Sequence, residues 1–144
     1  MKISVTKETK NGGLLIKKAE EKQMNKLTIS CGLIPKNKSS YFQEIKPKLL
    51  IKLYEKNKLI GVSGLITRHF FFNSLFLAVD KEYQRKGYGT KLVKEVLKRK
   101  KGLVFLTVGL NNHSALKIYG KLGFFKLIPW RKILGVKTNL MAHF

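Results

Sequence analysis

The stretch from Leu75 to Thr90, LFLAVDKEYQRKGYGT, passes from an apolar run into a polar turn that carries two glycines. Beyond the turn, apolar residues recur at helical spacing, and lysines fill positions on the opposite side; the apolar residues are Leu92, Val93, Val96 and Leu97. We therefore predict a strand over residues 75–79, a turn over 84–89 and a helix that begins close to Thr90.

This turn has a composition suited to binding an anion. The first turn of a helix has free backbone N–H groups and the positive end of the helix dipole. Gly87 and Gly89 lack the Cβ atoms that would keep an anion away from those groups, and Arg85, Lys86 and Lys91 add positive charge. The sequence predicts a phosphate or pyrophosphate site here, with an ordinary strand-to-helix connection as the alternative.

The length and composition predict one globular domain in a reducing compartment. The chain has 144 residues, of which 44% are hydrophobic, and no apolar run approaches the roughly 20 residues that span a bilayer. The first residues lack the apolar region of a signal peptide. The single Cys31 excludes an internal disulfide, fits a cytoplasmic location, and is expected to be a small core residue rather than a nucleophile.

The net charge favours negatively charged partners. The chain has 30 Lys and Arg residues against 8 acids, which gives a formal charge of +22. Phosphates, nucleic acid or an anionic membrane surface would be attracted by such a basic protein. The basic residues are 26 Lys and 4 Arg, a skew that can also reflect genome composition, so a functional basic surface and a compositional bias both stay open.

The remaining elements follow from hydrophobic patterns and turn signals. We expect a short edge strand within residues 1–12, a strand over 14–16, a helix over 20–33, a hairpin of strands 49–55 and 59–67, a strand over 103–108, a helix over 114–122, and strands over 124–128 and 136–144. Residues 35–47 are expected to form a helix or a loop beside a substrate site, and residues 129–135, with Trp130, a loop. This order indicates a mixed α/β sheet with helices packed on it.

Two segments together resemble the GNAT superfamily of acyl-CoA-dependent N-acetyltransferases. Residues 78–92 match its strand–turn–helix with the signature Q/R-x-x-G-x-G/A, and residues 112–124 match N-x-x-A-x-x-x-Y-x-x-x-G-F. The motifs cover 78–124, and the expected elements fit the family over 14–144. The resemblance implies one GNAT-like domain over 1–144, with a mostly antiparallel α+β sheet that contains a splayed parallel pair of strands.

The resemblance also implies a reaction and a site. Acetyl-CoA would be the donor, and a primary amine would attack it directly in a ternary complex. The pyrophosphate would lie on the turn and the pantetheine arm along the splayed strand; the implied cofactor-binding residues are Leu77, Ala78, Val79, Gln84, Arg85, Lys86, Gly87, Tyr88, Gly89, Thr90 and Asn112. A backbone N–H near Val79 would polarise the thioester, and Tyr119 would protonate the departing thiolate. No metal is implied.

The general base and the acceptor are not assigned. Where several members of the family carry a glutamate, this chain has Asn73, which can order a water but cannot take a proton at pH 7. The candidates for the base are Glu44, Glu55, Glu82, His69, His113 and solvent. Two other functions stay open: an acetyltransferase acting on aminoacyl-tRNA or a ribosomal protein, and a non-catalytic acyl-CoA-binding basic adaptor. A homodimer is also left open.

Overall fold

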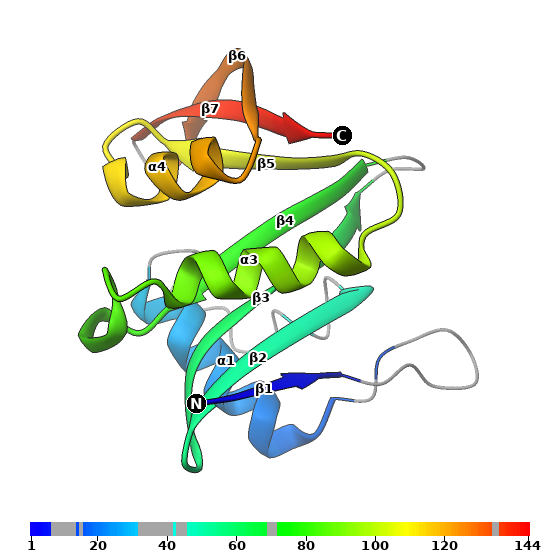
Figure 1. The fold of residues 1–144 in the computed structure, drawn as a ribbon, viewed down its shortest axis with the longest axis vertical. Coiled ribbons are helices and arrows are strands. Elements are labelled where there is room, and N and C mark those ends of the chain that lie inside the picture. The colour runs from blue at the N-terminus through cyan, green and yellow to red at the C-terminus, as the bar shows by residue number, and fades with distance from the viewer. Residues whose placement is uncertain (7–13, 15, 32–41, 43–45, 69–71, 134–135) are drawn as a thin grey trace.

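The computed structural model describes residues 1–6, 14, 16–31, 42, 46–68, 72–133 and 136–144. These residues form one seven-stranded sheet with helices on both faces (Figure 1). The elements are β1 (Lys2–Val5), α1 (Lys18–Ser30), β2 (Leu49–Glu55), β3 (Lys58–Arg68), β4 (Phe72–Val79), the 3-10 turn η1 (Lys81–Tyr83), α3 (Tyr88–Arg99), β5 (Val104–Gly109), α4 (His113–Lys121), β6 (Phe125–Ile133) and β7 (Val136–His143).

The sheet has the order β1-β2-β3-β4-β5-β7-β6, and every pairing is antiparallel except that of β4 with β5. This parallel pair is short, because it joins only Asn73 to Val104 and Ser74 to Phe105. The two strands then separate toward their carboxyl ends, as Figure 1 shows. The predicted mixed sheet with a splayed parallel pair is therefore confirmed.

Side chains of β4 alternate between two hydrophobic cores, as the pleat of a strand requires. Leu75 and Val79 belong to the core that α3 and α4 cover, whereas Phe76 and Ala78 belong to the core under α1. Helix α3 contributes Leu92, Val93 and Val96, all fully buried, so the amphipathic pattern read from the sequence is the face packed on the sheet. Burying one such side chain stabilises the fold by about 1.5–3 kcal/mol.

Most of the other predicted elements are present, with shifted ends. The hairpin of β2 and β3 turns at Lys56, which has a positive φ of 54°. The edge strand is β1, and the helix predicted over 20–33 is α1, which ends at Ser30. Helix α4 is followed by Gly123 with a φ of 91°, the left-handed conformation expected where a helix is stopped by glycine.

Two expectations differ from the structure. Residues 129–133 were expected in a loop, but β6 continues through Pro129 to Ile133 and pairs with β7. Because β6 is the last strand of the described sheet, the missing N–H of Pro129 can face the open edge, where it removes no ladder hydrogen bond. Leu14 forms only an isolated bridge instead of starting a strand over 14–16. Most of the segment 35–47 lies outside the described residues.

Candidate active site

The turn after β4 leads into a helix whose first amides have no cap from a side chain. Arg85 and Gly87 have positive φ values of 61° and 87°, and Gly87 is the N-cap of α3 without a side-chain hydrogen bond. The N–H of Lys91 donates to the Gly87 carbonyl at 3.1 Å, which is the first hydrogen bond of the helix. The N–H groups of residues 88–90 come before Lys91 and therefore have no carbonyl partner within the helix. They point out of the helix end, where an anion can accept from them.

The two glycines of this turn have different roles. A Cβ at Gly87 would meet nothing within 4 Å, so its left-handed backbone is what requires glycine there. A Cβ at Gly89 would lie 3.2 Å from Ile118 Cδ1 and 3.4 Å from Leu77 Cδ2. We expected both glycines to make room for an anion; at Gly89 the missing Cβ instead lets α3 approach β4 and α4 closely.

We predict that Gly87→Ala lowers the free energy of unfolding by about 1–2 kcal/mol, because an L-residue is strained in this conformation. Gly87→Asn should lower the free energy of unfolding by less, since Asn tolerates the left-handed region better than Ala does. Urea unfolding of the three proteins measures both losses. Equal losses for Ala and Asn would show that the backbone conformation does not set the cost.

Some backbone groups of strand β4 face the side from which β5 has separated. The N–H of Asp80 donates to the Ile60 carbonyl of β3 at 2.8 Å. Because backbone groups alternate in direction along a strand, those of Ala78 also face β3, whereas those of Leu77 and Val79 face the opposite edge. The three strand residues predicted to bind the cofactor therefore differ in direction. The backbone groups of Leu77 and Val79 face the gap between β4 and β5, and those of Ala78 face β3.

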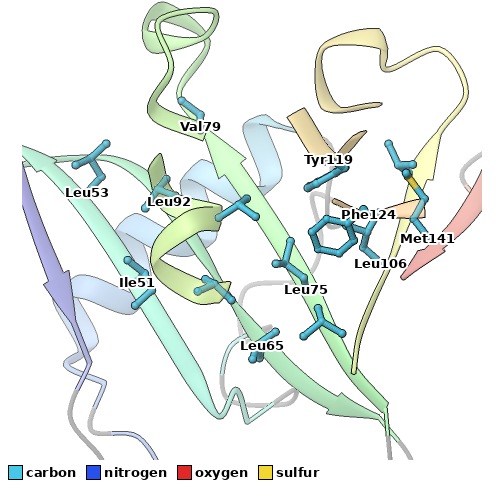
Figure 2. Packing of buried hydrophobic residues seen from close by; sticks show 14 of the residues in the cluster. Ile51, Leu53, Leu65, Leu75, Val79, Leu92, Leu106, Tyr119, Phe124 and Met141 are labelled. Atoms are coloured by element: carbon cyan, nitrogen blue, oxygen red, sulfur yellow. The ribbon is translucent and has the colours of Figure 1, made fainter. Parts of the chain in front are cut away.

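Tyr119 lies in the core beside this divergence. Figure 2 shows its ring between β4 and β5, and it makes an edge-to-face contact with Phe124, with 5.4 Å between centroids. The residue is 6% exposed, and burial raises the pKa of its phenol well above the usual value. Tyr119 therefore keeps its proton at neutral pH and can act as a hydrogen-bond donor.

Asn112 has a structural role that its motif does not reveal. It is the N-cap of α4, and its Oδ1 accepts from the backbone N–H of Ala115 at 3.2 Å. The residue is exposed, and capping uses the side-chain oxygen. The Nδ2 amide is the part of the side chain that a ligand could accept from.

The two roles of Asn112 can be separated by substitution. Asn112→Asp keeps the capping oxygen but loses the amide donor, so it should weaken acetyl-CoA binding while changing unfolding by less than about 0.5 kcal/mol. Asn112→Ala should cost about 1 kcal/mol of stability as well. Calorimetric titration and thermal unfolding measure the two effects. Unchanged affinity of the Asp variant would assign Asn112 to capping alone.

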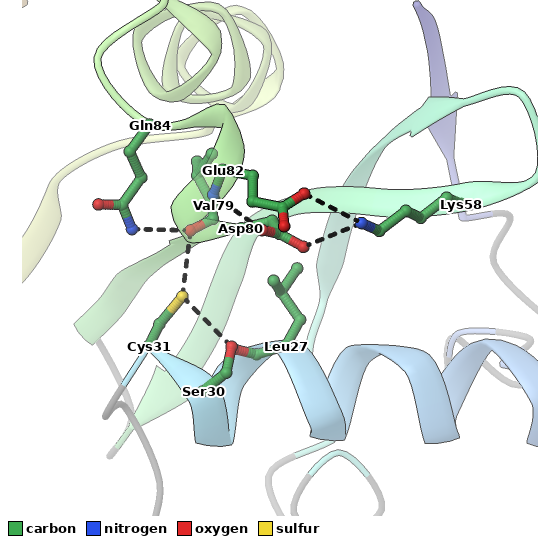
Figure 3. Close-up of polar contacts among 8 residues, drawn as sticks. All are labelled: Leu27, Ser30, Cys31, Lys58, Val79, Asp80, Glu82 and Gln84. Atoms are coloured by element: carbon green, nitrogen blue, oxygen red, sulfur yellow. Dashed lines mark hydrogen bonds and ion pairs between the residues drawn. The ribbon is translucent and has the colours of Figure 1, made fainter.

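The carboxylates proposed as a general base gather on the other side of β4. Lys58 Nζ lies 3.6 Å from Asp80 Oδ2 and 3.9 Å from Glu82 Oε2, as Figure 3 shows. A hydrogen bond with Glu55 raises the pKa of Tyr83 to about 12. Glu55 and Glu82 are thus engaged near the β2–β3 hairpin, while Tyr119 lies toward β5. His113 is exposed at the start of α4, and Glu44 and His69 lie outside the described residues.

One contact at the site had no signal in the sequence. The Cys31 thiol donates to the Val79 carbonyl at 3.2 Å, across 48 positions of the chain. Cys31 is partly buried and packs against the core under α1, and burial raises the pKa of its thiol. The thiol therefore stays protonated at neutral pH, in agreement with a core residue that also donates one hydrogen bond.

The fold resembles those of several solved structures. The ribosomal-protein-S18-alanine N-acetyltransferase of Escherichia coli is 19% identical, with a TM-score of 0.73 over 98% of this chain and 92% of that one. YncA of Salmonella typhimurium, solved with its cofactor acetyl-CoA, is 13% identical, with a TM-score of 0.75 over 99% and 94%. An aminoglycoside 6'-N-acetyltransferase complexed with coenzyme A is 18% identical, with a TM-score of 0.70 over 99% and 96%.

Curated protein sequences give no match to this chain. The sequence model of the acetyltransferase (GNAT) family, in contrast, matches residues 16–124, about three quarters of the chain. This range contains both sequence motifs, the glycine turn and Tyr119. The chain is therefore a member of the GNAT family of acetyltransferases.

Proposed function

We propose that this protein transfers an acetyl group from acetyl-CoA to a primary amine by direct attack within a ternary complex. The observation that carries the proposal is the open edge of β4 at Leu77 and Val79, which leads directly to the uncapped amides at the start of α3. An extended donor arm can hydrogen-bond to that edge as an added strand does. Its diphosphate would then lie on the amides from Tyr88 to Thr90, among the cations Arg85 and Lys86.

The amine nitrogen attacks the thioester carbon, a C–N bond forms, and the C–S bond breaks. A backbone N–H of β4 stabilises the oxyanion of the tetrahedral intermediate. Tyr119 donates a hydrogen bond, and then its proton, to the leaving sulfur. The proton that the amine loses passes to solvent, and Tyr119 is reprotonated from solvent. The high pKa of Tyr119 makes the hydrogen bond the larger part of its contribution.

The proposal is tested by incubating the protein with acetyl-CoA and a panel of amines while free thiol is followed. Acetyl-amine and CoA should appear in equal amounts. A reaction without amine measures hydrolysis, and a protein carrying Gly87→Ala tests whether the turn is needed. If acetyl-CoA binds but no amine releases thiol, the protein is the acyl-CoA-binding adaptor considered above. Failure of acetyl-CoA to bind would contradict both functions.

A second candidate acceptor is an amine carried by RNA, such as an aminoacyl-tRNA, and one observation favours it. Residues 84–144 contain 14 Lys and Arg residues and one acid, Glu95. Residues 1–83 contain 16 Lys and Arg residues and 7 acids. Glu95 is already paired with Lys98 at 3.1 Å and Arg99 at 2.6 Å. The exposed lysines of α3 and α4 (Lys91, Lys94, Lys98, Lys117 and Lys121) therefore lie in a strongly basic part of the chain.

Binding of bulk tRNA tests this candidate. For about six phosphate contacts, log K should fall with log salt concentration with a slope of about −4 to −5. Lys94→Glu combined with Lys117→Glu should weaken tRNA binding and leave acetyl-CoA binding unchanged. Absence of tRNA binding at low salt would exclude RNA as the carrier of the acceptor.

A further inference from the structure

The carbonyl of Val79, the last residue of β4, accepts hydrogen bonds from two side chains. Gln84 Nε2 donates to it at 2.9 Å, and Cys31 Sγ at 3.2 Å; both bonds are drawn in Figure 3. Gln84 lies in the glycine turn, five positions after Val79, and Cys31 is the C-cap of α1. One oxygen atom therefore joins the end of β4 to the turn and to a helix on the opposite face of the sheet.

The carbonyl and the N–H of Val79 both face the edge of β4 that β5 has left, where the backbone would meet an extended ligand. A carbonyl oxygen has two lone pairs, and here each has a donor. The N–H of Val79 faces the same edge and is the group of this residue that remains for a ligand. The two side chains thus turn the end of β4 into a donor toward the ligand.

The rest of the turn is held by further bonds. Asp80 Oδ1 accepts from the Glu82 N–H at 3.0 Å, and the Tyr83 N–H donates to the Asp80 carbonyl at 2.8 Å. With Gln84 bonded back to Val79, residues 79–84 form a closed loop directly before the left-handed residues Arg85 and Gly87. The orientation of the Val79 carbonyl is therefore coupled to the place where α3 begins.

We propose that Gln84 and Cys31 are paired positioning residues, which together hold the Val79 carbonyl so that the N–H of the same residue is presented to the acetyl donor and the turn is held for the diphosphate. This role rests on the proposed acetyl-CoA-dependent function. Either donor alone can hold the carbonyl, because one hydrogen bond satisfies most of its requirement. The loss of both should therefore exceed the product of the two single losses.

The ligand-free protein gives the first test, by hydrogen exchange of residues 80–84. Cys31→Ala and Gln84→Met should each speed exchange by less than about threefold, and the double variant by about tenfold or more, as expected from losing hydrogen bonds. Cys31→Ser and Gln84→Arg each keep a donor and should restore slow exchange when combined with the other deletion. Thr28→Val is the matched control, since the Thr28 hydroxyl donates to the Met24 carbonyl within α1 at 2.9 Å.

Steady-state kinetics with acetyl-CoA give the second test. The double variant should lower kcat/KM for acetyl-CoA by about tenfold, each single variant by less than about threefold, and the donor-keeping variants should recover it. An equal melting temperature of the double variant and the Thr28→Val control would exclude general loss of structure as the cause.

The outcomes separate this inference from the proposed function. If exchange follows the expected pattern but the wild-type protein does not bind acetyl-CoA, the paired bonds stand and the acetyltransferase proposal falls. The pairing would be overturned if the double variant exchanges as slowly as wild type. It would also be overturned if the increase in its exchange rate equals the product of the two single increases. Faster exchange with unchanged kcat/KM would overturn the positioning role.

Discussion

Tyr119→Phe is expected to lower kcat by about 10- to 100-fold, with little change in the affinity for acetyl-CoA. The substitution removes only the hydroxyl, so the ring packing against Phe124 is kept. General acids contribute about 10²- to 10⁴-fold to a reaction, and the high pKa of this buried phenol places the effect at or below the lower limit of that range. Steady-state kinetics, with calorimetric titration of acetyl-CoA, separate the two quantities.

The control for this variant is Tyr54→Phe, which removes a hydroxyl from a partly buried tyrosine packed against the other core. Its kcat should stay within twofold of wild type. If Tyr119→Phe also stays within twofold, Tyr119 is a core residue and takes no part in proton transfer.

The pH dependence of kcat gives a second observation on Tyr119. Burial disfavours the charged phenolate, so the pKa of Tyr119 in the folded protein lies above the reference value of about 10. The protonated form, which donates, is therefore present throughout the range below pH 10. If kcat falls as the pH rises toward 10, and Tyr119→Phe abolishes this fall, the assignment is contradicted.

Gly64→Ala is expected to have the largest effect on stability, a loss of about 3 kcal/mol in the free energy of unfolding. Gly64 lies in β3, a central strand, opposite Leu50 and Phe76. A Cβ there would overlap the Leu49 carbonyl oxygen and lie 3.0 Å from Phe76 Cε1. Because the overlapping atom belongs to the backbone, the strand itself would have to move.

Gly120→Ala is the matched control, since a Cβ at that exposed position of α4 meets nothing within 4 Å. It should stabilise the protein by up to about 1 kcal/mol, because alanine favours helix more than glycine does. Urea unfolding of the two variants compares the effects directly. A loss of less than 1 kcal/mol for Gly64→Ala would mean that β2 and β3 shift apart easily.

The sequence predicted the elements that have strong periodicity or marked turns. Helix α3, the hairpin of β2 and β3, and the Gly123 stop all depend on neighbouring residues, which the sequence displays directly. The splayed pair of strands came from the family resemblance, because pairing between β4 and β5 depends on residues about 30 positions apart. The length of β6 was missed, because a proline followed by Trp130 has the local appearance of a loop.

The parts of the site that sequence could not predict are tertiary contacts. Residue 89 is a glycine because the side chains of Ile118 and Leu77 lie close to it, and the residues next to it in the sequence do not show this. The Cys31–Val79 bond joins a helix end to a strand end, and no motif carries that information. The motif identified Asn112, but its capping bond to Ala115 becomes visible only once the start of α4 is placed.

Strand β6, the last strand of the sheet in the described part of the chain, has a consequence for how the protein behaves at high concentration. It exposes Phe125, Leu127 and Ile128, and Phe125 stacks on the C-terminal Phe144 with 5.3 Å between ring centroids. Such an edge invites other chains to add to it, while the charge of +22 keeps the molecules apart. Dissolved ions screen that repulsion, and the Debye length is about 3 Å at 1 M salt. High salt should therefore promote aggregation of the protein.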